Sequence, residues 1–540
     1  GPVTVQGNFT ADGGTIKLDG NYPVGSSNTA LGNGALNDSL TGQQNTAIGS
    51  ASLAALTSGN DNTAVGRVSL SNNTTGGQNT AVGRYALSVS TTGSSNTALG
   101  AQALNSNTTA SSNTAVGYHA GYSNTTGSPV TAMGYYTLDQ NTTGVHNNAY
   151  GYRAMRFNTT GGYNTALGGD ALYSNTTASN NTAVGYQAGY ANTTGTITAL
   201  GAFAGYANTT GSSNLALGGY DGTTPSALRF NTTGSYNVAV GTGALQANTT
   251  ASGNTAVGYA ALETNTTGTR NVAVGFQALE MNTTGVDNVA IGYDALEDNT
   301  TGLFNTALGN YALTDNTTAS HNTAVGYQAG YFTTSGSANA FFGDQAGYFT
   351  TSSNNTFIGD DSGWLVTSGA NNTILGRYNG NQGGLDIRTS SNNIVLSDGD
   401  GNPRAYWNNV GSTFLPATAG ITTGQSANFY INSSTGELAR STSSLRYKNT
   451  VNDATHGLTE LLALRPVTYK GNNDGDTVFG GLIAEEVHDA GLTEFVQYND
   501  DGEPDALAYG NMVSLCIKAI QEQQVTITAL QARIEALENA

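Results

Sequence analysis

The sequence predicts a mainly β fold: a β-solenoid or β-roll shaft of seventeen-residue coils, followed by a C-terminal α+β domain that ends in a coiled coil. Three observations carry this prediction. A motif close to "NTAVG" recurs at a fixed spacing, clusters of Asn, Thr and Gly separate its copies, and the composition changes abruptly near residue 441. A short fixed period indicates a solenoid, in which each copy buries its apolar face only against its neighbours.

The spacing of the motif is nearly constant. The glycine that closes it falls every seventeen residues from Gly49 to Gly185 and again from Gly241 to Gly343. The steps from Gly185 to Gly201 and from Gly343 to Gly359 are one residue short, and residues 219–230 contain a six-residue insertion. About twenty-one coils at ~4.8 Å each predict a shaft on the order of 100 Å long.

Each coil is expected to hold a strand through "NTAVG", a second strand near "YQAL" or "YQAGY", and turns at "NTTG" and at the "SSN"-like segment. Side chains alternate along a strand, so the Val, Leu or Ile of the motif is expected inside and its Ala on the opposite face, against a neighbouring strand or subunit. The predicted interior residues are Val65, Val82, Leu99, Val116 and their equivalents. Ala replaces the Gly of "NTTG" at four places, so we expect no positive φ there; they are Ala110, Ala178, Ala251 and Ala319.

Composition and charge exclude several classes of function. The formal net charge of −19 argues against nucleic-acid binding and against adhesion to anionic membranes. Cys516 is the single cysteine, so no disulfide framework is expected and assembly in a reducing cytoplasm is compatible. No apolar run approaches the ~20 residues of a membrane span, and we expect no membrane insertion and no cofactor. The chain begins "GPVTV" without Met, from which we expect an upstream truncation or a cloning scar.

Four regions follow from these patterns. Residues 1–27 are a β-rich lead-in, 28–376 the repeat shaft, 377–440 a β-rich connector and 441–540 a domain of ordinary composition. A helix is expected from about residue 512. Its apolar residues repeat every seven positions, which predicts a short coiled-coil seam that Gln523 interrupts. The two series are Ile520, Ile527 and Ile534, and Cys516, Gln523, Leu530 and Leu537.

Several ordered motifs of the last hundred residues point to a known family. "STSSLRYKN", "LLALRPVTYK", "GGLIAEEVHDAG" and "YGNMVSLCIKAIQEQ" precede the coiled coil. Together they resemble the endosialidase-type intramolecular chaperone domain at the C-terminus of phage tailspikes and tail fibres. The resemblance implies a trimeric chaperone that templates the fibre and then removes itself by self-cleavage. More loosely, the repeats resemble the β-roll heads of trimeric autotransporter adhesins.

The resemblance also implies a cleavage site. In the family, a Ser in an S-D-x-R-x-K pattern attacks the peptide bond before it, with the Lys as its partner. The matching residues are Ser443 and Lys448, with cleavage between Thr442 and Ser443, and Ser444 stands where the family has Asp. The chemistry is sound in itself: a Lys takes a proton from Ser only when its pKa is lowered, and Arg446 is a candidate for the assisting positive charge.

We therefore expect a structural, receptor-binding phage tail fibre, a virion protein assembled in the cytoplasm of the host bacterium. Its expected partners are two further copies in a homotrimer and a host-cell receptor, a glycan or an outer-surface protein. The alternatives are a bacterial surface trimeric adhesin and a polysaccharide-depolymerising tailspike. Acidic residues are sparse in the repeats, so we expect no enzymatic activity in the shaft; the only expected activity is the Ser-Lys self-cleavage of the C-terminal domain.

Other candidate sites lie outside the chaperone. Asp398, Asp400 and Asn402 have the spacing of a Ca²⁺ loop, but Pro403 stands at the usual Gly position and Asn409 at that of the bidentate Glu, so we favour a Gly-rich hairpin turn. The "NTT" asparagines match glycosylation acceptors, but in a bacterial product we interpret them as a turn ladder. A tyrosine follows the motif glycine in many coils and could bind sugars or pack as a ladder. Departures from the period are further receptor-binding candidates: the insertion, and the distal coils with Asp344, Asp360, Asp361 and Trp364.

Overall fold

The computed structural model describes residues 27–36, 40–415, 450–470, 476, 478–499 and 501–540, and the backbone of two short strands at 429–431 and 438–440. The chain divides into two compact units, residues 1–420 and 421–540. The predicted lead-in, 1–27, lies almost wholly outside the described residues.

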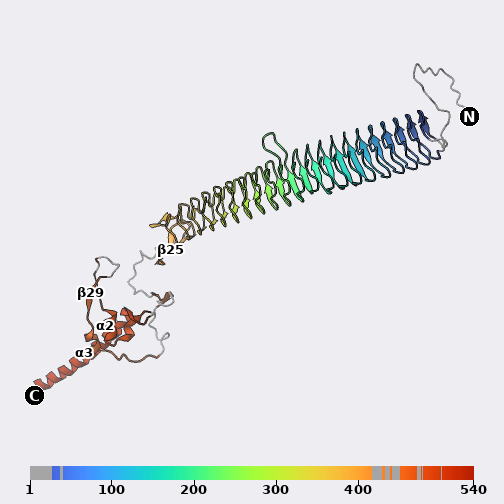
Figure 1. The fold of residues 1–540 in the computed structure, drawn as a ribbon. Coiled ribbons are helices and arrows are strands. Elements are labelled where there is room, and N and C mark those ends of the chain that lie inside the picture. Colours follow the sequence, from blue (N-terminus) through green and yellow to red (C-terminus); the bar gives the residue numbers. More distant parts are fainter. Residues whose placement is uncertain are drawn as a thin grey trace, which may run out of the picture. The chain divides into compact units, whose positions relative to one another are not determined.

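The first unit is a β-solenoid with about twenty-one coils of seventeen residues, as the period predicts. Each coil contributes one short strand, and each strand pairs in parallel and in register with the next, as Ala98 pairs with Ala115 and Ala115 with Ala132. Figure 1 shows these strands side by side along the stack, with the insertion after β12 projecting as a loop. The described residues of the repeat region contain no helix.

The strands of the stack are β1 Thr29–Leu31, β2 Thr46–Ile48, β3 Thr63–Val65, β4 Thr80–Val82, β5 Thr97–Leu99, β6 Thr114–Val116, β7 Val130–Met133, β8 Asn147–Tyr150, β9 Thr165–Leu167, β10 Thr182–Val184, β11 Ile197–Leu200, β12 Asn214–Leu217, β13 Val238–Val240, β14 Thr255–Val257, β15 Val272–Val274, β16 Val289–Ile291, β17 Thr306–Leu308, β18 Thr323–Val325, β19 Ala340–Phe342, β20 Thr356–Ile358 and β21 Thr373–Leu375.

The second strand predicted in each coil is wrong. The "YQAL" segment is a series of turns in which two residues take positive φ, as Tyr85 (61°) and Leu87 (52°) do. A buried Leu rarely adopts this conformation. It is held here because the Leu87 N–H donates to the carbonyl of Ala103 in the next coil at 3.0 Å and its side chain is fully buried.

The predicted orientation of the strands is also wrong. The Ala of each motif fills the interior, where Ala64, Ala98 and Ala115 are completely buried, and the residue after it points outward. Val82 is 38% exposed and Leu99 40% exposed. We call these outward residues the outer apolar row; its members are Leu31, Ile48, Val65, Val82, Leu99, Val116, Met133, Tyr150, Leu167, Val184, Leu200, Leu217, Val240, Val257, Val274, Ile291, Leu308, Val325, Phe342, Ile358 and Leu375.

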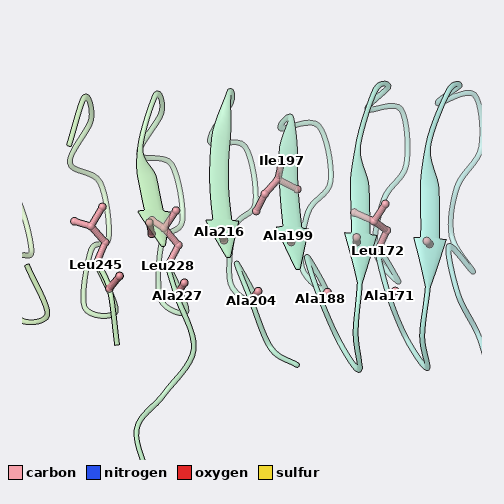
Figure 2. Close-up of a cluster of buried hydrophobic side chains, with 14 of the residues drawn as sticks. Ala171, Leu172, Ala188, Ile197, Ala199, Ala204, Ala216, Ala227, Leu228 and Leu245 are labelled. Atoms are coloured by element: carbon pink, nitrogen blue, oxygen red, sulfur yellow. The ribbon is translucent and has the colours of Figure 1, made fainter. Parts of the chain in front are cut away.

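One interior position holds Leu in some coils and Gly in others. Where it holds Gly, a side chain from a neighbouring strand fills the space. Coils with "AGY" place Gly189 and Gly205 where other coils have Leu172 or Leu228. Ile197 replaces the usual strand-flanking Asn there, and its side chain packs against both glycines. Figure 2 shows Ile197 between Leu172 and Leu228 in the row of buried side chains. Near the end of the stack, Phe341 and Phe357 fill the same space beside Gly347 and Gly363. The interior thus keeps its volume, as close packing requires.

Two ladders of buried asparagines connect the coils. In the first, Asn96 beside the strand accepts from the backbone N–H of Asn113 at 3.0 Å and donates to the carbonyl of Ala110 at 2.9 Å. The second is formed by the "NTTG" asparagines, where Asn141 donates to the side-chain oxygen of Asn124 at 2.7 Å. Side chains of both ladders have no exposed surface. Buried amides are tolerated because their polar atoms are paired.

Two glycines recur in most coils, and they differ in backbone conformation. The motif glycines, such as Gly117 (φ 134°), have positive φ, and a Cβ there would collide with the carbonyl of the glycine in the next coil. The "NTTG" glycines, such as Gly144, do not have positive φ, which confirms the expectation from the Ala replacements.

The stack ends in antiparallel structure. A hairpin of β22 (Asn381–Gln382) and β23 (Leu385–Asp386) follows β21. β24 (Ile394–Ser397) then returns to pair in parallel with β21. The sheet is completed by β25 (Pro403–Trp407) and β26 (Thr413–Phe414), both antiparallel to their neighbours.

The second unit contains short hairpins and three helices among its described residues. Its elements are β27 Phe429–Ile431, β28 Leu438–Arg440, α1 Leu458–Ala463, β29 Val467–Tyr469, β30 Phe479–Gly481, α2 Ala484–Asp489, the 3₁₀ turn η3 Thr493–Phe495, β31 Val496–Tyr498, β32 Pro504–Leu507 and α3 Tyr509–Glu538. A small core of Val487, Leu492, Phe495 and Leu515 joins α2 to the start of α3. The carboxylate of Glu522 on α3 accepts from the N–H of Leu458 at 2.8 Å, which fixes the start of α1.

Candidate functional site

The predicted cleavage residues, Thr442, Ser443, Arg446 and Lys448, lie outside the described residues, as does Ser444. The structure therefore leaves the self-cleavage prediction untested. The other motifs of the resemblance lie within the second unit. "LLALRPVTYK" spans the end of α1 and β29, "GGLIAEEVHDAG" runs from β30 through α2, and "YGNMVSLCIKAIQEQ" begins α3.

α3 carries the apolar seam that the heptad pattern predicts. Ile520 is 63% exposed, Ile527 41% and Ile534 54%, and Leu530 and Leu537 are exposed as well. Only the first part of the helix packs within its own unit, through Met512, Leu515 and Ala519. The remaining turns present apolar side chains with no cover from the described part of this chain.

A pocket of about 640 Å³ opens between β29 and β32 in the second unit. Its lining includes Arg465, Tyr469, Glu485 and Tyr509. The Tyr509 hydroxyl accepts from the N–H of Leu482 at 2.7 Å and fixes one wall. Arg465 is paired with Glu486 on α2, and that pairing lowers the pKa of the Glu486 carboxyl.

The structure brings the four distal receptor-binding candidates onto neighbouring coils. Asp344 and Asp360 each follow the motif glycine of their coil, and Arg377 occupies the same position one coil further. Arg377 contacts Asp360 at 3.0 Å and Asp361 at 2.9 Å, so two of the three carboxylates are neutralised. Burial, with smaller effects of Asp360 and Asp361, raises the pKa of Asp344.

Trp364 lies against an aromatic cluster. Its ring centroid is 5.5 Å from that of Phe349 and 6.2 Å from that of Tyr348. The Phe349 ring stacks in turn on Phe332 at 5.4 Å. The buried indole N–H of Trp364 has no hydrogen-bond partner among the described residues. The sequence did not indicate this cluster beyond Trp364 itself.

The Ca²⁺-loop candidates form the turn between β24 and β25. The Asp398 carboxylate accepts from the backbone N–H of Asp400 at 3.1 Å and of Asn402 at 2.9 Å, and it is paired with Arg404. These bonds, first of all that from Asn402, lower the pKa of Asp398. The carboxylate thus stabilises a hairpin turn. Within the described parts of the chain, no group of three acidic, His or Cys side chains could hold a metal ion.

The tyrosines after the motif glycine form stacked rows. Tyr118, Tyr135 and Tyr152 stack at 5.5 and 5.6 Å, and Tyr259, Phe276 and Tyr293 at 5.1 Å. Tyr186 and Tyr327 occupy the same position in other coils. The rings are 38–52% exposed, so they pack along the stack and still present surface.

The insertion is fixed to the shaft by specific contacts. The Asp221 carboxylate accepts from the N–H groups of Thr223 and Thr224, which lowers its pKa, and the Thr224 hydroxyl lies 2.8 Å from that of Tyr259. The guanidinium of Arg229 packs over several aromatic rings, the closest being Phe203 at 4.8 Å.

The "NTT" asparagines are not accessible as glycosylation acceptors in the fold. Each is completely buried, and each donates to the carbonyl three residues later, which confirms the turn ladder. The five are Asn107, Asn124, Asn141, Asn158 and Asn175.

A row of carboxylates was missed from the sequence. Glu263, Glu280 and Glu297 occupy one position in three successive coils, and Asp294 beside them is 9% exposed, with one carboxylate oxygen unpaired. Burial, followed by Asp294 and other neighbouring carboxylates, raises the pKa of Glu297 to about 7. The seventeen-residue spacing of the three glutamates is the sequence signal that could have revealed this row.

The comparisons with known proteins give no relative: no family model, no curated protein and no solved structure matches the chain. Among the described helices, none is long and apolar enough to cross a membrane.

Proposed function

We propose that this chain is the shaft and intramolecular chaperone of a homotrimeric, receptor-binding phage tail fibre. The observation that carries the proposal is the outer apolar row, which continues through every strand of the stack. Monomeric proteins rarely expose a contiguous apolar patch larger than roughly a few hundred Å². A row that spans the whole shaft therefore calls for cover along its full length.

A second and third copy of the same chain supply that cover. Because neighbouring strands pair in parallel and in register along the stack, the row of one copy matches the row of another coil by coil. Association would bury Leu99, Met133 and Leu167 and their equivalents at about 25 cal/mol per Å² of apolar surface.

The exposed seam of α3 supports the same assembly. Ile527 and Ile534 are seven residues apart on one face of a thirty-residue helix, the pattern that packs in coiled coils. A helical bundle at the C-terminus would align the chains before the coils close. This matters because identical repeats pair out of register at almost no cost.

Removal of the chaperone by cleavage before Ser443 would leave the assembled shaft kinetically trapped. The proposal for the peptidase rests on the resemblance of residues 441–449 and on the order of the motifs that follow them. Receptor binding would then belong to the shaft, at its departures from the regular period.

The assembly is tested by multi-angle light scattering of the freshly purified chain, for which we expect the mass of three copies. A monomer at micromolar concentration contradicts the proposal. Incubation with host capsule and assay of new reducing ends separates a binding fibre, which releases none, from a depolymerase. Phage structural genes beside the coding sequence would support a tail fibre over a bacterial adhesin.

A further inference from the structure

The last coil before β24 departs from the period. Asn372 and its ladder partner Asn393 are 21 residues apart, four more than the usual seventeen. The additional residues form the β22–β23 hairpin, whose turn is Gly383–Gly384. The four-residue excess was not noticed in the sequence, because the motif itself has drifted to "SNNIVLS" there.

The hairpin is anchored firmly. Tyr378 at its base is completely buried, and its hydroxyl donates to the carbonyl of Leu385 at 2.8 Å. Ile387 on the returning strand is also buried, and its N–H donates to the carbonyl of Gly380 at 2.8 Å. A rigid hairpin can hold side chains in place for a ligand.

A pocket of about 290 Å³ lies between this hairpin and the preceding coils. Phe349, Leu365 and Thr367 come from the coils, and Asp386, Arg388 and Thr389 from the hairpin and the residues that follow it. One wall is therefore mainly apolar and the other polar. The Phe349 ring is held by its stack on Phe332 and by Trp364, so the apolar wall is fixed too.

The charges of the pocket cancel. Arg388 donates to both oxygens of Asp386, from Nε at 3.0 Å and from an Nη at 2.8 Å. The backbone N–H of Arg388 donates to the same carboxylate at 3.1 Å. A guanidinium has five N–H groups, so donors remain free and point in fixed directions, and the carboxylate keeps acceptor capacity.

We propose that this pocket binds one neutral pyranose ring of a glycan. The volume is close to the lower end of ligand pockets, about 300 Å³, which suits a single sugar ring. The carbon face of a pyranose packs on Phe349 and Leu365, while its hydroxyls pair with Arg388, Asp386 and the threonine hydroxyls. A charged sugar is disfavoured, because Asp386 already neutralises the charge of the guanidinium and the chain carries a net charge of −19.

The pocket lies away from the surface that we assign to the trimer. Phe349 comes seven residues after Phe342 of the outer apolar row, and Leu365 seven after Ile358, which is nearly half of a coil. Neither residue belongs to the outer apolar row. The biological role of this site rests on the proposed receptor-binding function, whereas the binding itself does not.

The test is saturation-transfer NMR on the full chain with the methyl glycosides of glucose, galactose, mannose and N-acetylglucosamine, and with N-acetylneuraminic acid as the anionic comparison. We expect saturation of the ring protons of at least one neutral glycoside, with a Kd of about 1 mM. The variants Arg388→Lys, Thr389→Val and Phe349→Ala are each expected to weaken binding about tenfold, roughly 1.4 kcal/mol. Tyr236→Ala, at a 70% exposed ring of a distant coil outside the tyrosine rows, is the control and should bind as the wild type does.

The proposal is overturned if no neutral glycoside binds, if only the anionic sugar binds, or if both Arg388→Lys and Thr389→Val bind like the wild type. Circular dichroism shows whether each variant keeps the fold. A chain that forms trimers and cuts before Ser443 but binds no glycoside removes the pocket and leaves the proposed function standing. A chain that stays monomeric but binds a glycoside removes the proposed function and leaves the pocket standing.

Discussion

The side-chain amide of Asn141 donates to the side-chain oxygen of Asn124, one coil earlier, at 2.7 Å. The same amide donates to the carbonyl of Gly144 at 3.1 Å, and the Asn141 oxygen accepts from Asn158 at 2.7 Å. One residue thus links three coils inside the solenoid.

We predict that Asn141→Ala destabilises the shaft by about 2–4 kcal/mol per chain, because it leaves the buried Asn158 donor and the Gly144 carbonyl short of a partner. The measurement is the denaturant midpoint of unfolding followed by circular dichroism. Thr143→Ala, an exposed change two residues away, is the control and should stay within about 0.5 kcal/mol of the wild type. Equal midpoints for the two variants would refute the role of the ladder.

A second prediction compares Ala substitutions at two glycines in neighbouring coils. Gly117 has a φ of 134°, and a Cβ there would meet the carbonyl oxygen of Gly134. Gly144 does not have a positive φ, and Ala110 occupies the equivalent place in another coil. A Cβ at Gly144 would also collide with the Gly161 carbonyl oxygen, so both substitutions carry a steric cost. Gly117→Ala adds the strain of a positive φ and should therefore be the more costly of the two, by about 1–3 kcal/mol. The melting temperatures of the two variants test this prediction. If Gly144→Ala lowers the melting temperature more than Gly117→Ala does, the positive φ of Gly117 is not the cause of the cost.

The period predicted the solenoid, but it could not orient the strands. Both residues of an Ala-Val pair are apolar, so alternation alone does not tell which one is inside. The available signal was the difference in variability between the two positions. The inner position is Ala in most copies, whereas the outer one varies from Val to Met, Tyr and Phe, as at Met133 and Tyr150. A close-packed interior tolerates less variation in volume than a surface does.

The turn at "YQAL" was missed for a similar reason. Leu87 at a φ of 52° contradicts ordinary preferences, and only the packed coils on either side maintain it. A signal existed in the exchange of this Leu for Gly, as at Gly121 and Gly189. The distal pocket could not have been predicted, because it depends on where the β22–β23 hairpin packs.

A third prediction separates the two faces of one strand. Ala98→Asp places a charge in the dry interior and should unfold the neighbouring coils, at a cost of several kcal/mol per chain. Asp at Val82, Leu99 and Val116 together changes only outward positions. It should keep the β spectrum and convert the proposed trimer to a smaller species. Light scattering and circular dichroism of the two variants test this, and an intact trimer for the triple variant would contradict the assigned interface.

The row of glutamates predicts a pH dependence. The folded-state pKa of Glu297, about 7, lies above its ordinary value of 4.5, so the folded chain binds the proton more tightly than the unfolded chain does. The free energy of unfolding should consequently fall as the pH rises from 4.5 to about 7 and level off above it.

Glu297→Gln removes the charge and should flatten this slope, with the larger gain in unfolding midpoint at about pH 8. Asp287→Asn is the matched control. Its carboxyl has a lowered pKa because of the hydrogen bond from Arg270, so this change should leave the slope between 4.5 and 7 as it is. A Glu297→Gln variant with an unchanged slope would place the titration elsewhere.

The last prediction concerns the proposed cleavage between Thr442 and Ser443, which should follow trimerisation. Ser443 supplies the attacking oxygen and Lys448 takes its proton, and both depend on a folded chaperone. Ser443→Ala and Lys448→Ala should each give full-length trimers, because folding needs the shape of the domain and not its hydroxyl. Arg446→Ala should slow the cut and move its pH optimum upward, since Lys448 would lose the positive charge that keeps it partly neutral. Intact mass measurement of fresh and aged protein decides the matter. If no fragment beginning at Ser443 appears over days at neutral pH, Ser444 in place of the family's Asp has disabled the peptidase, and the second unit acts as a permanent cap on the fibre.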